Sequence, residues 1–186
     1  VPLIKENIIK SDNIVCDSKS GYSGAGVKFD KNNLFSKNKY NFYNYNTNKH
    51  RHICEIRQEL SKNSKSSVKF SFNPHILPIF RGMMTTIYCD LNKTVSQNTL
   101  KNCLKKFYSK SKFVKILKET ERLDFFRVQN TNHCFITFFN HYDTSKIIIV
   151  SCIDNLLKGA SGQAIQCMNI MNNLNDSTGL EKHISE

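Results

Sequence analysis

The sequence predicts an α+β domain with one mixed, mostly antiparallel sheet and helices on one face. Short apolar stretches that alternate with polar residues outnumber stretches of helical period. Most of these expected strands follow one another directly, whereas a parallel doubly wound sheet needs a crossover helix between strands. The length of 186 residues suits one hydrophobic core. We therefore expect a single domain over residues 1–186, without internal repeats.

The N-terminal quarter predicts few regular elements. Residues 2–10 have the character of the end of a helix, and Asn13–Asp17 is a short strand. Ser18–Gly26 holds three glycines and three serines, which is typical of a loop. Residues 29–39 are polar and irregular, and Asn41–Tyr45 alternates aromatic residues with asparagine, as a strand does.

The middle of the chain predicts a helix followed by two strands. In His52–Ser61 the apolar residues recur on one helical face with charges opposite. Val68–Phe72 alternates apolar and polar residues, which predicts a strand with one dry face. Residues 74–82 contain two prolines and predict an extended loop before the longer strand Met83–Leu91.

The C-terminal half predicts two helices separated by strands. Ser96 is the expected N-cap of a helix to about Ser109, and a second helix covers Leu157–Met171. A polar tail, residues 172–186, is expected to fray. The four strands expected between the helices are Phe113–Leu117, Phe125–Val128, Cys134–Phe139 and Lys146–Cys152.

The formal net charge is +12, which raises the question of a polyanionic partner. Lysine and asparagine are abundant in all the expected loops, without a basic helix face or an RNA-binding signature. This pattern favours compositional drift over a nucleic-acid-binding module, and a phosphorylated substrate would also suit a positive field. No run of about 18 apolar residues indicates a membrane span. The seven cysteines are irregularly spaced and form no C-x-x-C, so we expect no metal site and a reducing cytoplasm.

Four places in the sequence combine residues that bind anions or transfer protons. The loop around Ser20, Gly21, Ser23 and Gly24 lacks the G-x-G-x-x-G order of a dinucleotide fingerprint, but its amides and hydroxyls can approach a ligand. By itself the loop is equally compatible with a flexible surface turn. Arg81 follows an apolar stretch, where an arginine either clamps a carboxylate or phosphate or forms a surface ion pair.

His50, Arg51 and His52 stand at an expected helix start, where the helix dipole lowers the pKa of a histidine. A lone histidine there is more often partly exposed and structural. The fourth, segment 154–164, joins a buried strand to a helix, and its lysine and two glycines predict a backbone anion site.

These motifs occur together, in this order, in one family. The chain resembles the C-terminal catalytic and dimerisation domain of N-acetyl-gamma-glutamyl-phosphate reductases and, more distantly, aspartate-semialdehyde dehydrogenases. The resemblance implies a fold like that of the glyceraldehyde-3-phosphate dehydrogenase C-terminal domain. The matching runs are residues 17–26, 49–52 with Glu55-Ile56, 74–78 with Arg81-Gly82, 131–134 and 154–164.

The resemblance implies NADPH-dependent reduction of an acyl phosphate through a cysteine thioester, by a homo-oligomer in the cytoplasm. It implies an acid/base role for His52, with His50 held in reserve because the paired histidines leave the register open. Ser20, Gly21, Ser23 and Gly24 would line the substrate pocket, with Arg81 and Arg51 holding its anionic groups.

Asn155, Lys158 and Gly159 would face the nicotinamide. The family's nucleophilic Gly-Cys-Tyr-Pro-Thr motif and its dinucleotide fingerprint are absent from this sequence. We therefore expect a piece of a longer enzyme that is inactive alone, the alternatives being a non-catalytic dimerisation domain and a nucleic-acid-binding module. Cys54 stands where the family commonly has proline.

Overall fold

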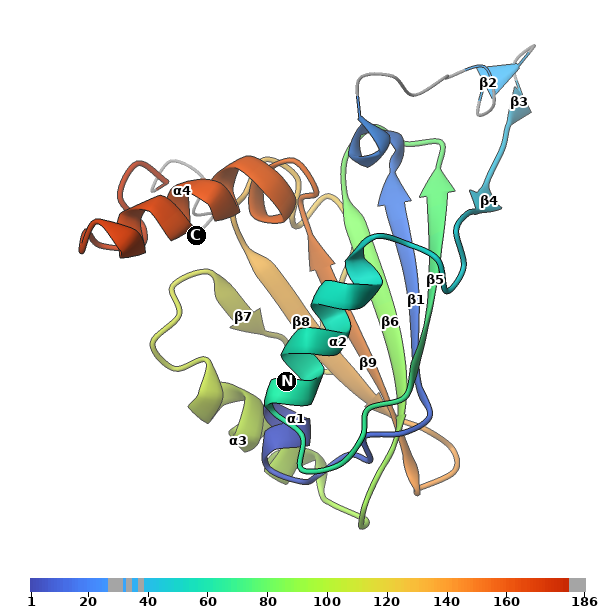
Figure 1. Cartoon of the computed structure of the whole chain (residues 1–186), viewed down its shortest axis with the longest axis vertical. Helices are drawn as coiled ribbons and strands as arrows, with labels where there is room; N and C mark the ends of the chain where they lie inside the picture. Colours follow the sequence, from blue (N-terminus) through green and yellow to red (C-terminus); the bar gives the residue numbers. More distant parts are fainter. Residues whose placement is uncertain (27–31, 33–34, 37–38, 181–186) are drawn as a thin grey trace.

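One seven-stranded sheet organises the molecule (Figure 1). The structure is a computed structural model that describes residues 1–26, 32, 35–36 and 39–180. In sheet order the strands are β4 (Tyr43–Asn44), β5 (Phe70–Leu77), β1 (Ile14–Gly21), β6 (Met83–Asp90), β9 (Lys146–Ile153), β8 (Cys134–Asn140) and β7 (Val114–Ile116). The pairs β1–β5 and β7–β8 are parallel and the other neighbours antiparallel, so the predicted mixed sheet is confirmed.

Three helices cover one face of this sheet, as predicted (Figure 1). They are α1 (Pro2–Lys5), α2 (His52–Lys62) and α3 (Gln97–Phe107), while α4 (Gly162–Met171) lies beyond one end of the strands. The Ser96 hydroxyl accepts a hydrogen bond from the Thr99 amide at 3.2 Å, which confirms the predicted cap of α3. The described part of residues 29–39 includes β2 (Phe35–Ser36) and β3 (Lys39–Tyr40), which pair with each other; the rest of that stretch lies outside the described residues.

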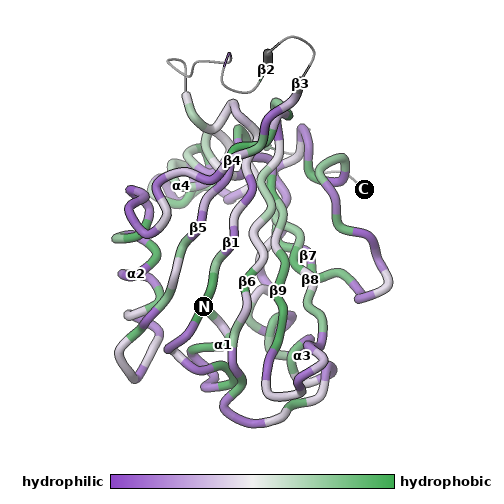
Figure 2. Tube along the Cα trace, turned by 90° about the vertical axis from the view of Figure 1, so that its right-hand side faces the viewer, coloured by the Kyte–Doolittle hydropathy of each residue, from purple (hydrophilic) through white to green (hydrophobic). Residues whose placement is uncertain are grey.

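The main core lies between the helices and the sheet because strand residues alternate in direction. Ile14, Cys89 and Ile147 point toward the helices and are almost completely buried. On the opposite face Val15 and Tyr88 remain 37% and 43% exposed. Figure 2 shows the hydrophobic character of the central strands β6 and β9 against the more polar loops.

A second, smaller cluster covers part of that opposite face. Its buried members are Leu117, Val128, Phe135 and Cys152. Val128 belongs to a turn rather than to a strand, so the predicted strand Phe125–Val128 is wrong. Phe125 and Val128 are apolar because they pack in this cluster, whereas Phe126 is 85% exposed.

Two expected loops are strand instead. β1 continues through Ser18 and Ser20 to Gly21, and β5 continues through Pro74 to Leu77. The two strands pair in parallel over their full lengths, from Ile14 with Phe70 to Gly21 with Leu77. The ends of both strands contain polar residues or proline and lack the alternating apolar pattern that predicts a strand. Their strand conformation depends on backbone pairing with a distant segment.

The expected helix at residues 2–10 ends early, at Lys5, and Asn7 has a positive φ of 53°. The tail is also more ordered than predicted as far as residue 180. Leu180 is 1% exposed, and the side-chain Nδ2 of Asn169 donates to the carbonyls of Asp176 and Thr178. Residues 181–186 lie outside the described residues.

Candidate active site

A buried aspartate organises the junction between β9 and α4. Asp154 is completely buried, and its Oδ1 accepts hydrogen bonds from the amides of Leu156 at 2.8 Å and Leu157 at 3.1 Å. Its Oδ2 accepts from the Asn130 amide at 2.7 Å. The carboxylate thereby caps the π turn η3 (Leu157–Ser161), which leads directly into α4. The predicted long helix from Leu157 to Met171 is confirmed, with a π-type first turn.

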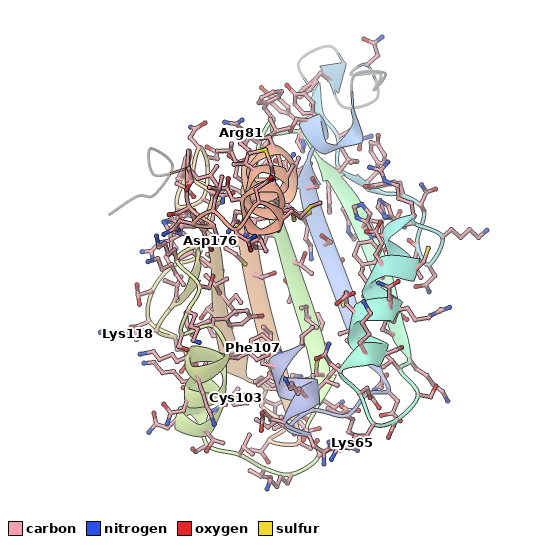
Figure 3. The ribbon with its side chains drawn as sticks, turned by 60° about the vertical axis from the view of Figure 1, so that its left-hand side comes forward. Lys65, Arg81, Cys103, Phe107, Lys118 and Asp176 are labelled. Carbon is pink, nitrogen blue, oxygen red and sulfur yellow. The ribbon has the colours of Figure 1, made fainter. Side chains whose placement is uncertain are left out.

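The same carboxylate holds Arg81. The Arg81 Nε lies 3.3 Å from Oδ2 of Asp154, and Nη1 donates to the Asn130 side-chain oxygen. The arginine side chain is 25% exposed, so its guanidinium reaches from a buried anchor toward solvent. Figure 3 shows Arg81 at the end of the sheet next to α4. The Nη2 group forms no hydrogen bond within the described part of the chain and is available to an anion.

Asn155 connects this junction to the serine-glycine loop. Its Oδ1 accepts from the Gly82 amide at 2.7 Å, and its Nδ2 donates to the Ser23 hydroxyl at 2.8 Å. Ser23 in turn donates to the Phe80 carbonyl at 2.5 Å. The side chain of Asn155 therefore clamps two loops that are far apart in the sequence.

Glycine is required where these loops meet. A Cβ at Gly21 would lie 2.6 Å from the Phe80 carbonyl oxygen, and one at Gly24 would lie 3.0 Å from the Ser20 hydroxyl. Gly21 ends β1, and Gly24 lies in the short 3-10 turn η1 (Tyr22–Ala25). The structure thus brings Ser20, Gly21, Ser23 and Gly24 together with Asn155 and the Arg81-Gly82 segment.

The two histidines have different environments at the start of α2. The Nδ1 of His50 accepts from the His52 amide at 3.2 Å, and its Nε2 lies 3.4 Å from the Tyr45 hydroxyl. Burial lowers the pKa of His50, and the neighbouring His52 and Arg51 lower it further. His52 is exposed, and Arg51 beside it is exposed too.

His52 lines an apolar cavity of about 510 Å³ between the helices and the sheet. Ser18 and Met83 line the same cavity, and Met83 pairs with Ser20 across β1 and β6. His52 makes no hydrogen bond to Ser20, Ser23 or Asn155 within the described residues. His52 therefore lines this cavity, whereas Ser20, Ser23 and Asn155 do not, and the histidine pair and the serine-glycine cluster form no common hydrogen-bonded network among the described residues.

Lys158 points away from solvent. Its ammonium donates to the Gln166 side-chain oxygen at 2.5 Å and lies 5.7 Å from the centre of the Phe113 ring. Burial lowers the pKa of Lys158. Gly159, by contrast, is exposed on the π turn. Of the three residues expected to face a nicotinamide, only Gly159 presents itself to solvent.

Most cysteines are unsuited to nucleophilic chemistry. Burial raises the pKa of Cys16 and Cys134 to about 11, and that of Cys89 and Cys152 to about 12. These thiols remain protonated at neutral pH, whereas the thiolate is the nucleophile. Among the described residues no group of three or more His, Cys, Asp or Glu side chains is arranged to hold a metal ion.

Sequence reasoning missed the roles of Asp154, Asn130 and Gln166. Gln166 is buried and accepts from both Asn132 and Lys158. For Asp154 a signal existed, since a carboxylate directly after a buried strand and before a helix is a typical cap. For Asn130 and Gln166 the partners come from distant segments, and no local pattern indicates them.

Comparisons with known proteins indicate the family of the chain. The family model for the dimerisation domain of semialdehyde dehydrogenases matches residues 1–155. An N-acetyl-gamma-glutamyl-phosphate reductase of Thermoanaerobacter pseudethanolicus is 44% identical over 97% of this chain and 52% of its own length. A probable chloroplastic reductase of the same name from Arabidopsis thaliana is 43% identical over 97% of this chain and 45% of its own. The chain spans about half the length of these curated relatives.

Solved structures support the fold. Aspartate semialdehyde dehydrogenase II from Vibrio cholerae superposes with a TM-score of 0.71 at 16% identity, over 92% of this chain and 57% of that one. No helix among the described residues has both the length and the apolar character that crossing a membrane requires. Because the family model matches most of the sequence and the fold agrees, the chain belongs to the semialdehyde dehydrogenase dimerisation-domain family.

Proposed function

We propose that this chain is the C-terminal catalytic and dimerisation part of an N-acetyl-gamma-glutamyl-phosphate reductase. The reaction is the NADPH-dependent reduction of N-acetyl-L-glutamyl 5-phosphate to the 5-semialdehyde and phosphate, a step of arginine biosynthesis, in the cytoplasm. The names of the relatives support this proposal. The observation that carries it is the Asn155 clamp, which joins the serine-glycine loop to the Arg81 segment beside the His52 cavity.

The substrate carries a carboxylate and a phosphate, and the cluster offers donors for both. The partly exposed guanidinium of Arg81 is held by Asp154, so it meets an anion with little loss of side-chain entropy. The Ser20 hydroxyl, which donates to the Gly21 carbonyl in this structure, can turn toward a ligand as a neutral donor. The amides of Gly21, Tyr22 and Ser23 already donate to backbone carbonyls, so this part of the loop shapes the pocket. Arg51 is exposed at the start of α2 and adds positive charge on the histidine side.

His52 is the proposed acid/base. Its ring is accessible and lines the cavity, whereas His50 is partly buried and uses its Nδ1 to accept the His52 amide. An imidazole side chain can take up and return a proton during a reaction. His50 then acts as a positioning residue that holds the first turn of α2.

A nicotinamide cofactor would supply hydride. On this chain the π turn at Gly159 is the surface that suits it, because Gly159 is exposed to solvent. Asn155, just before this turn, links it to the serine-glycine cluster by its hydrogen bond to Ser23. The side-chain amide of Asn155 and the ammonium of Lys158 are already held by protein groups. We therefore assign Asn155 and Lys158 to shaping this surface.

The nucleophilic thiol and the dinucleotide-binding domain would come from a further part of the enzyme. The raised pKa values of the buried cysteines support this assignment. The helix α4 also presents apolar side chains to solvent, with Met168, Ile170 and Met171 exposed by 52%, 62% and 81%. Such a face is suited to packing against another domain.

A second copy of the chain is the proposed partner at the open face of the sheet. The family description names a dimerisation domain. Val15 and Tyr88, on adjacent strands β1 and β6, leave an apolar patch exposed on the face that no helix covers. Burial of this patch against its symmetry mate would form an isologous dimer.

The test is an assay of this chain alone and fused behind the preceding half of the Thermoanaerobacter relative. With NADPH and the acyl phosphate we expect no turnover from the chain alone and measurable turnover from the fusion. His52→Ala in the fusion should reduce kcat by about a hundredfold, typical of lost acid/base catalysis. His141→Ala, outside the site, is the matched control and should leave the rate unchanged.

Turnover by the isolated chain would contradict the proposed division of labour. If His52→Ala leaves the rate unaltered and His50→Ala causes a large loss, His50 is the acid/base and His52 the positioning residue. If neither histidine matters, the chain is a non-catalytic dimerisation domain.

A further inference from the structure

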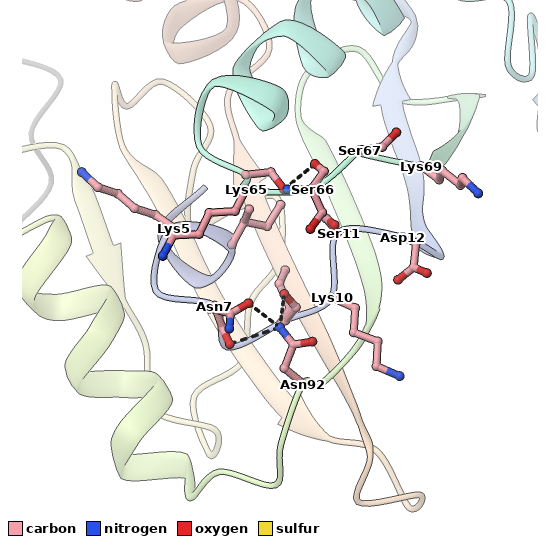
Figure 4. Close-up of a pocket in the computed structure, with 13 residues that line it drawn as sticks. Lys5, Asn7, Lys10, Ser11, Asp12, Lys65, Ser66, Ser67, Lys69 and Asn92 are labelled. Carbon is pink, nitrogen blue, oxygen red and sulfur yellow. Dashed lines mark hydrogen bonds between the residues drawn. The ribbon is translucent and has the colours of Figure 1, made fainter.

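A second hollow lies at the other end of the molecule and is surrounded by lysines (Figure 4). Its volume is about 380 Å³, and segments 4–12, 64–69 and Asn92 line it. We call it the lysine pocket, after Lys5, Lys10, Lys65 and Lys69. Figure 3 shows Lys65 at the opposite end of the sheet from Arg81, so this pocket is separate from the candidate active site.

The pocket carries an uncompensated positive charge. Its four lysines are all exposed, and none of them forms an ion pair within the part of the chain that the structure describes. Asp12 is the only carboxylate among the lining residues, which leaves a net charge of +3. Like charges gathered around a concave surface focus the potential there and attract counter-ions.

The walls of the pocket are fixed before any ligand arrives. The Asn92 side chain donates to the Asn7 side-chain oxygen at 2.8 Å and to the Ile9 carbonyl at 3.1 Å (dashed lines in Figure 4). The Lys69 amide donates to the Ser11 carbonyl at 2.9 Å, which joins the second wall to the first. A preformed site loses less conformational entropy when a ligand binds.

Neutral donors stand among the lysines. Ser11, Ser66 and Ser67 place hydroxyls on the lining, and the amides of Lys65 and Ser67 donate no hydrogen bond within the described residues. In Figure 4 Lys5 and Lys65 flank one side of the serines, while Lys10 and Lys69 flank the other. The lining includes no aromatic ring on which a nucleobase could stack.

We propose that the lysine pocket binds a compact polyanion with two or more negative charges, of the diphosphate or tricarboxylate class. Oxygens of such a ligand accept hydrogen bonds from the serine hydroxyls and free amides while the flanking lysines neutralise its charge. The absence of a stacking surface favours a small ligand over a nucleic-acid strand. The site is additional to the proposed substrate site and does not depend on it.

The test is a titration of the ¹⁵N-labelled chain with pyrophosphate and, separately, with citrate, followed by NMR at low ionic strength. We expect saturable shifts confined to the amides of residues 10–12 and 65–69. The two ligands distinguish phosphate from carboxylate selectivity. The double variant Lys65→Ala/Lys69→Ala should weaken binding roughly tenfold, because two charge-assisted contacts are lost.

Lys105→Ala/Lys106→Ala is the matched control, since it removes the same charge from exposed positions on α3. It should leave the affinity within about twofold. Equal weakening by both double variants, or unsaturated shifts spread over all lysines, would mean diffuse attraction to a basic protein and would overturn the proposal. If a single-stranded oligonucleotide binds at these residues more tightly than pyrophosphate does, the proposal of a compact ligand is overturned. Thermal unfolding of each variant, expected to match the parent, verifies that the fold is intact.

Discussion

The substitution Asp154→Asn tests whether one buried carboxylate holds the candidate site together. Asparagine has nearly the same shape, so its oxygen can still accept from the amides of Leu156 and Leu157. Its amide nitrogen would replace Oδ2, which now accepts from the Asn130 amide and faces the Arg81 guanidinium. The N–H groups of the new side-chain amide would then face the Asn130 amide and the Arg81 guanidinium, which are also donors, at a position that is completely buried.

The expected cost follows from these contacts. Removing one partner of a buried ion pair costs about 3–5 kcal/mol, because the remaining charge has no compensation. Arg81 keeps 25% exposure and can turn toward water, so we expect the lower end, about 3 kcal/mol. This is a large share of a typical stability of about 5–15 kcal/mol.

Urea unfolding followed by circular dichroism measures the change. With a slope of about 2 kcal/mol per molar urea, the midpoint should fall by about 1.5 M. The control Asp12→Asn alters an exposed carboxylate and should shift the free energy of unfolding by less than about 0.5 kcal/mol. A loss below about 1 kcal/mol for Asp154→Asn would refute the argument that this aspartate anchors Arg81 and the π turn.

Two further predictions concern titration and assembly. Burial holds the pKa of His50 below its ordinary value of 6.5, so the unfolded chain binds more protons in that range and the free energy of unfolding should fall as pH drops below about 6.5. His50→Gln should flatten this part of the profile, and an NMR titration midpoint of His50 at or above 6.5 would contradict the assignment. Tyr88→Glu should convert the proposed dimer to monomer in sedimentation equilibrium, whereas Tyr142→Glu, at a site that is 96% exposed, should leave the dimer intact. A monomeric parent chain, or a Tyr88→Glu dimer, would argue against the open sheet face as the interface.

The local pattern of the sequence was sufficient for the elements with strong hydrophobic periodicity. The strands β6, β8 and β9 and the helices α2 and α3 lie close to their predicted bounds. In each of them one face is apolar and the ends carry turn or cap residues, as with Ser96 before α3. The pattern failed where pairing with a distant segment decides the structure, as in the polar ends of β1 and β5.

For the candidate site, too, the sequence indicated individual residues but not the contacts between them. Motif reading proposed Ser20, Ser23 and Arg81, since glycine, serine and arginine in loops are suited to anions, and the family resemblance added Asn155. Their mutual contacts could not be predicted, because Ser23 and Asn155 are 132 residues apart in the sequence. The inward orientation of Lys158 was missed for a related reason, as its partner Gln166 is buried by the packing of α4.

Composition and periodicity alone were thus enough to predict the α+β fold and its helical face, and they pointed to the segments proposed to carry chemistry. Those properties depend on local preferences and on which residues avoid water. The folded structure was needed to show that Asp154 anchors Arg81, that Asn155 clamps two loops and that the lysines of segments 5–10 and 65–69 share one pocket. Each of these contacts joins residues that only sheet formation brings together, and no local sequence signal records them.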